Sequence, residues 1–305
     1  HDVALKCVEL ADLYAGANNL REAEILLKRA LRIYEEGPGK QPENEPGMIV
    51  TLGSLGRIHA RQGRWAESQG LIERAIALTK KTSKKPSTEL AELLESQVRI
   101  LHASGENKEA LDKAASLIDV RKKLDGAESA HVSSLMELQA DIMVMLGDLA
   151  DAEKLYAKSL SIKEKVLVGG NPQVTTLLNK LGELKIQRKD YKGALEHYKK
   201  SLEMNRNLWG KSHPVLAFAE LNLAKCYEAM KDIPNAKKAF SEAITIMETA
   251  AGESHEDTAS VLEQYCVFLN REGQTEEASQ IAKRISSIRE QSDLRHTAVQ
   301  LKTFH

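Results

Sequence analysis

The chain of 305 residues lacks the features that mark several classes of protein. Aromatic residues make up 4% of it, so a core must be built from Ala, Leu and Ile. Its three cysteines, Cys7, Cys226 and Cys266, are odd in number and far apart, which favours reduced thiols over a disulfide framework. No apolar run reaches the ~18 residues of a membrane span, and no signal-peptide pattern is present. We therefore expect a protein of the cytoplasm or another reducing compartment, without membrane insertion.

An excess of charge of either sign is also missing. Lys and Arg number 43 and Asp and Glu number 44, which gives a net charge of −1. Proteins dedicated to nucleic acids or to membrane surfaces usually carry a basic excess. Neither nucleic acid nor a membrane surface is therefore expected as a partner.

Motifs that carry chemistry are absent as well. There is no Gly-x-Ser-x-Gly, no dinucleotide-binding fingerprint and no Cys-x-x-Cys. Gly210-Lys211-Ser212 resembles the end of a phosphate-binding loop, but Asn205 stands where that loop needs a glycine, and no strand precedes it. We expect no enzymatic activity, no cofactor and no metal site.

What the sequence does contain is a repeat. Its anchor is a small residue that is followed, seven positions later, by an Ala/Ser–Leu/Ile pair in all but the third and seventh units, which match the pattern least well. The spacing between anchors is 45 residues once and then 42 residues five times, so seven units account for nearly the whole chain. The anchors are Ala23, Ser68, Ala110, Ala152, Ala194, Ala236 and Ala278.

Two other positions follow the same frame. Twelve residues before each anchor stands a small residue, except for Val98, and small residues let helix backbones approach closely. Five residues before each anchor stands Gly or Asn, except for Lys189 and Lys231. Gly and Asn suit the left-handed residue that ends a helix. Each unit therefore predicts two antiparallel helices; in the fifth unit they run from about Val174 to Arg188 and from about Tyr191 to Asn207.

A pair of helices cannot bury its apolar faces alone, but stacked neighbours form a continuous core. We predict an all-α fold, an α-solenoid of about seven helix-turn-helix units over residues 1–291, and a C-terminal tail or capping segment at 292–305. The units span about 3–47, 48–89, 90–131, 132–173, 174–215, 216–257 and 258–291. Exposed loops are expected at Glu35–Gly47 and Lys80–Pro86. His213 and His255 lie one unit apart, so they cannot share a metal, and we place them at helix starts.

The columns resemble the tetratricopeptide repeat (TPR) family, as in Leu10-Ala11-x-x-Tyr14 and Leu223-Ala224-x-x-Tyr227. The 42-residue unit and the connector Gly210-Lys211-Ser212-His213-Pro214 are similar to the kinesin light chain branch. The resemblance implies a right-handed superhelix whose first helices line a concave groove. The heptad segment that joins kinesin light chains to the motor is not present, so motor binding is not implied. Asp2-Val3-Ala4 already stands in the repeat register, which indicates a fragment of a longer protein.

Polar residues of the first helices that lie off the packed columns are the candidate partner-binding residues. Arg can hold carboxylates in a bidentate manner, and Asn can bond to an extended backbone. The arginines favour an acidic partner segment, although Glu92 and Glu95 could neutralise them internally. The predicted groove residues are Arg57, Arg61, Arg99, His102, Asn179, Glu183, Asn222, Lys225 and Glu228.

The function predicted from these features is that of a non-enzymatic adaptor or scaffold that binds a peptide segment of another protein in the groove. Two alternatives stay open. One is a regulatory or complex-assembly factor that uses the convex face and the loops. The other is a helical-repeat RNA binder, which the unit length and the neutral charge disfavour.

Overall fold

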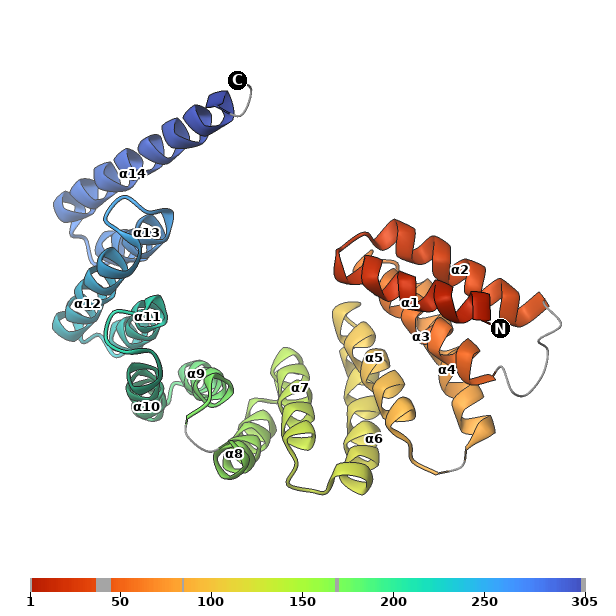
Figure 1. The fold of residues 1–305 in the computed structure, drawn as a ribbon. Helices are drawn as coiled ribbons and strands as arrows, with labels where there is room; N and C mark the ends of the chain where they lie inside the picture. The colour runs from red at the N-terminus through yellow and green to blue at the C-terminus, as the bar shows by residue number, and fades with distance from the viewer. Residues whose placement is uncertain (1, 37–44, 84, 168–169, 303–305) are drawn as a thin grey trace. The chain divides into compact units, whose positions relative to one another are not determined.

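The computed structural model describes residues 2–36, 45–83, 85–167 and 170–302, with side chains up to Gln291. Over these ranges the protein is all-α and contains no strand (Figure 1). The helices are α1 (Asp2–Gly16), α2 (Leu20–Glu36), α3 (Glu45–Arg61), α4 (Trp65–Thr82), α5 (Thr88–Ala103), α6 (Asn107–Asp125), α7 (Ala130–Leu146), α8 (Leu149–Val166), α9 (Pro172–Gln187), α10 (Tyr191–Trp209), α11 (Pro214–Ala229), α12 (Ile233–Ala251), α13 (Glu256–Arg271) and α14 (Thr275–Lys302).

These helices pack as sequential pairs, which confirms about seven helix-turn-helix repeats. The chain forms two compact units, unit 1 (His1–Ile162) and unit 2 (Lys163–His305). In unit 1, α1 also contacts α3, and α3 contacts α5; in unit 2, α9 contacts α11, and α11 contacts α13. The first helices of the first three repeats are therefore neighbours, and so are those of the last three. The right-handed superhelix and the repeat boundaries stay predictions.

The small-residue columns are where the two helices of a repeat touch. Six of the seven anchors have no exposed surface, and Ala278 retains 2%. Facing them, Gly182 lies so close to Tyr198 that a Cβ would overlap the tyrosine ring. Ser68 stands where the other repeats have alanine. Its buried hydroxyl is not left without a partner, because it donates to the carbonyl of Gly56 at 2.7 Å. Space at these contacts is limited to hydrogen or a methyl-sized group.

The turn inside each repeat depends on one left-handed residue. All seven residues five positions before the anchors have positive φ, and five of them are the predicted Gly or Asn. Lys189 and Lys231 adopt the same conformation with φ of 62° and 61°. A Cβ in this region meets the following carbonyl and costs roughly 1–2 kcal/mol. The turn geometry is therefore imposed by the packing of the repeat even where the residue is unfavourable.

The first helix of each repeat from the third to the seventh begins with a side-chain cap. The hydroxyls of Ser87 and Ser129 accept from the backbone N–H groups of Leu90 and Val132. Asn171, His213 and His255, each 42 residues further along, accept from Gln173, Val215 and Asp257. The prediction that both histidines stand at helix starts is confirmed.

Two predicted loops have ends that differ from the structure. Glu35, Glu36 and Glu45–Gly47 are helical, so the first predicted loop is shorter than Glu35–Gly47, and its centre at 37–44 lies outside the described residues. Lys80–Thr82 belong to α4, because the Thr79 and Thr82 hydroxyls bond to carbonyls one turn earlier and fit a continuing helix. Residues 292–302 continue α14.

We expect Ala194→Leu to lower the free energy of unfolding by about 1–3 kcal/mol, because the added atoms have no space at a fully buried contact. Glu196→Leu, on the exposed side of the same helix, should change it by less than about 0.5 kcal/mol. Chemical denaturation of both variants measures the difference. Equal stabilities would show that the anchor does not limit the approach of α9 and α10.

Lys189→Gly should raise the free energy of unfolding by about 0.5–1 kcal/mol, because glycine adopts positive φ without strain. Lys192→Gly, three residues along and inside α10, should instead lower it by about 1 kcal/mol. Thermal unfolding of the two variants tests the opposite signs. A loss of stability in Lys189→Gly would contradict the strain argument.

Candidate functional site

In unit 1 the predicted groove residues lie on α3 and α5, but their side chains have internal partners. Arg61 donates to the carbonyl of Ala15 at 2.8 Å and to the Asn18 side chain at 2.9 Å, so it caps the end of α1. Arg99 forms a two-bonded ion pair with Glu95 on its own helix. Glu95 therefore neutralises Arg99, whereas the partners of Arg61 are uncharged.

Arg57 and His102 are the other two predicted residues of unit 1. Arg57 donates to the Ser54 hydroxyl at 2.9 Å and lines, with Arg61, a small pocket of about 160 Å³ beside α1. The Nδ1 atom of His102 lies 2.8 Å from the Asn107 side-chain oxygen, at the start of α6. The structure thus brings Arg57 and Arg61 together, and it joins His102 to the next helix.

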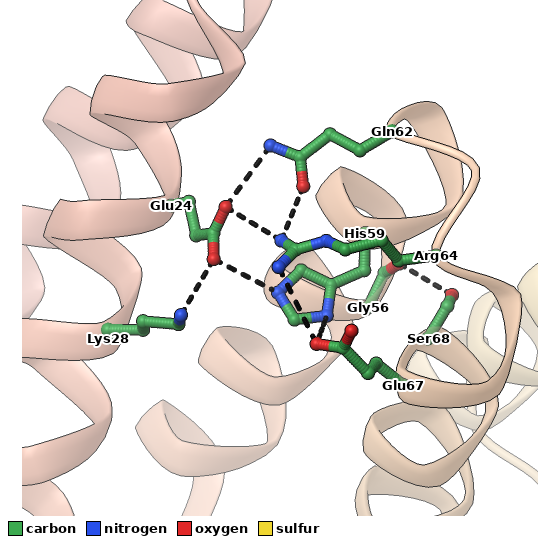
Figure 2. Close-up of polar contacts among 8 residues, drawn as sticks. All are labelled: Glu24, Lys28, Gly56, His59, Gln62, Arg64, Glu67 and Ser68. Carbon is green, nitrogen blue, oxygen red and sulfur yellow. Dashed lines mark hydrogen bonds and ion pairs between the residues drawn. The ribbon is translucent and has the colours of Figure 1, made fainter.

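A polar network that the sequence did not reveal joins the first two repeats of unit 1 (Figure 2). Glu24 on α2 accepts from Arg64 at 2.7 Å, from Lys28 at 2.7 Å and from Gln62 at 3.1 Å. His59 on α3 is buried between Glu24, 3.5 Å from Nε2, and Glu67, 3.4 Å from Nδ1. The sequence gives one signal of this network: His59 occupies the repeat position that the apolar Leu101 holds in the next unit, 42 residues later.

The titration of this network follows from its contacts. Burial disfavours the Glu24 carboxylate, but the hydrogen bonds from Arg64, Lys28 and Gln62 outweigh burial and lower the pKa of Glu24 to about 2. For His59, burial and then the charge of Arg64 lower the pKa of the imidazole, against the opposite effect of the two glutamates. His59 therefore packs as a neutral ring, and the network stabilises the junction of the two repeats.

In unit 2 the predicted residues lie on α9 and α11. Asn179 is partly buried and its Oδ1 atom has no hydrogen-bond partner among the described residues, while Glu183 is exposed. On α11, Asn222 and Glu228 are partly buried and Lys225 is exposed. The unit thus presents polar side chains on two neighbouring first helices.

Lys225 and Glu228 also line a pocket of about 870 Å³, which we call the α11–α14 pocket. Its apolar surface includes Val267, 49% exposed, and Ile285. Arg271 of α13 pairs with Glu228 of α11 at 3.2 Å and closes one edge. Val267 and Arg271 are not among the residues predicted from the sequence, although Val267 stands 42 residues after Lys225 and therefore occupies the same position in the next repeat.

The described residues hold no group of three or more His, Cys, Asp or Glu side chains suited to a metal ion. Among the described helices none is long and apolar enough to cross a membrane. What the arrangement offers is a partly apolar surface with a charged rim, carried by stacked helix pairs; such a fold belongs to the helical-repeat proteins.

The sequence matches the tetratricopeptide repeat family over residues 4–37, 51–86, 131–207 and 172–249. These matches span both units and follow the helix pairs of the structure. The chain belongs to the tetratricopeptide repeat family. Members of this family commonly mediate protein–protein interactions. Among curated proteins, none matches the sequence of this chain significantly.

Solved structures with this fold are similar at low identity. A putative kinesin light chain with nearly identical TPR-like repeats from Podosopora anserina has a TM-score of 0.61 and 17% identity, over 70% of this chain and 99% of that one. The STAND signal-transduction ATPase with a tetratricopeptide repeat sensor from Pyrococcus horikoshii has a TM-score of 0.72 and 13% identity, over 100% and 44%. A Rap protein complexed with competence and sporulation factor has a TM-score of 0.52 and 15% identity, over 93% and 74%. These similarities show the fold.

We expect the contribution of Glu24 to stability to depend on pH. Because its folded-state pKa lies below the unfolded value, the stabilisation is complete above about pH 4.5 and declines as the pH falls towards 2. Glu24→Gln should therefore destabilise the protein more at pH 7 than at pH 3.5. Denaturation curves of both proteins at the two pH values test this, and an equal loss at both would contradict it.

Proposed function

We propose that the chain is a non-enzymatic adaptor or scaffold that binds a peptide segment of a partner protein on the α9, α11 and α13 side of unit 2. The observation that carries the proposal is the α11–α14 pocket, which combines exposed Val267 with the polar residues Lys225 and Glu228. Because this surface is built from packed helices, binding a segment there does not require this chain to lose the conformational entropy of a flexible loop.

The pocket suggests how the energy of binding would be divided. Burial of Val267 under a partner side chain would supply affinity. Full burial of an exposed aliphatic side chain contributes about 1.5–3 kcal/mol, and the half-exposed Val267 would gain part of that. The pair of Arg271 and Glu228 is already formed and leaves Lys225, exposed on α11, as the cation that would select the partner. Polar rims of this kind contribute mainly to specificity.

The alternative, a regulatory or complex-assembly factor that uses the outer face and the connectors, remains compatible with the same fold, because family membership does not choose the binding face. An RNA-binding function finds no support in the neutral charge balance. The three free thiols are consistent with the cytoplasm or another reducing compartment.

Val267→Asp should weaken partner binding by about tenfold or more, because a charge replaces an apolar contact of the pocket. Quantitative affinity capture from cell extract, with the wild type and the variant side by side, identifies partners that depend on the pocket. Calorimetry with a purified partner then gives the affinities.

The matched control is Ser260→Asp, which introduces the same charge two turns earlier on α13 and at the border of the pocket. We expect a smaller loss there, because the serine offers no apolar contact. If every captured protein bound the wild type and Val267→Asp equally well, the proposed face would be wrong, and the outer face would become the candidate.

A further inference from the structure

A second pocket of unit 2 gathers cationic side chains from three elements. It has a volume of about 480 Å³ and lies between α10, the α10–α11 connector and α12; we call it the α10–α12 pocket. Arg206 comes from α10, Lys211 from the connector and Lys238 from α12, and Ser241 adds a hydroxyl. It shares no lining residue with the α11–α14 pocket.

The three cations are only weakly compensated. The contacts of Arg206 with Glu220 and of Lys238 with Glu242 are both 3.9 Å long, beyond hydrogen-bonding distance. Lys211 has no ion pair with any described residue of the chain. Like charges that converge on one pocket repel each other, and an anionic ligand relieves that repulsion.

Glu220 and Glu242 repel an anion in the α10–α12 pocket less strongly than two full negative charges would. The Glu220 side chain is only 5% exposed and shares a hydrogen bond with Glu242. Burial and the neighbouring Glu242 raise the pKa of Glu220 to about 7, against the opposite effect of Arg206 and Lys238. Near neutral pH the pair therefore holds one proton for part of the time, and the pocket keeps a positive balance.

We propose that the α10–α12 pocket binds a phosphorylated side chain in a segment of a partner protein. A phosphate monoester carries nearly two negative charges and three acceptor oxygens, which three converging cations satisfy better than they satisfy a planar carboxylate. Beside Lys211, the exposed ring of Trp209 stacks on His213 with centroids 4.9 Å apart. This aromatic surface offers contacts to the rest of the segment, which a free phosphate ion lacks.

The test uses the full chain and a peptide library with a central phosphoserine and degenerate flanks, with the same library carrying serine and with inorganic phosphate. Fluorescence polarisation should detect binding of the phosphorylated library and none of the serine library. Lys211→Glu should weaken the phosphopeptide selected in this way by about tenfold or more, because an attractive charge becomes a repulsive one. Lys283→Glu, an exposed site on α14 outside both pockets, should leave its affinity unchanged.

A variant that is expected to tighten binding distinguishes a specific site from a general effect of net charge. Glu220→Gln keeps the shape of the buried side chain and removes its charge, so phosphopeptide binding should tighten several-fold at pH 8 and less at pH 6.5. If this variant does not fold, as judged by its thermal transition, the exposed Lys211→Glu variant and its Lys283→Glu control decide alone. Binding that Lys211→Glu leaves intact, no binding at all, or equal competition by inorganic phosphate would overturn the proposal.

Discussion

The structure depends on the close approach of two helices at one pair of small residues in each repeat. The anchor alanines are fully buried, and at Gly182 or Gly56 even a methyl group would overlap the facing side chain. Because this contact fixes the distance between the helices, the chain must reverse within a few residues at each turn. Lys189 and Lys231 accept left-handed backbone for that reason. Local preference yields to packing at these two turns.

Polar side chains in this protein serve the stacking of repeats in several ways. Ser68, Ser159 and Ser201 bond to carbonyls of the facing helix, so a hydroxyl replaces a methyl group without an unpaired donor. The network around Glu24 joins α2 to the following helix pair through its ion pair with Arg64. Such contacts use up polar groups that would otherwise be available to ligands. Arg61 and Arg99 are examples, since both have partners inside the protein.

The surfaces available to partners are those where a charged side chain lacks a close ion pair or an apolar side chain is exposed to solvent. Val267 is half exposed although it stands on a helix whose other large apolar residues are buried. The cations of the α10–α12 pocket have only long contacts with carboxylates. These two pockets share no lining residue, so unit 2 could hold two segments at once. Scaffolds work by bringing such segments together.

The sequence by itself determined the architecture. A 42-residue spacing of small residues, turn residues and helix caps predicted the helix pairs, because each feature reports a local requirement that recurs in every repeat. It also placed Lys225 and Glu228 on a first helix beside what proved to be a pocket. Only the tertiary structure decided which polar residues are already paired. Arg61 bonds to Ala15 and Asn18 of the preceding repeat, and His59 lies between Glu24 of that repeat and Glu67 of its own. Side-chain reach and rotamer decide these contacts, and no spacing rule encodes them.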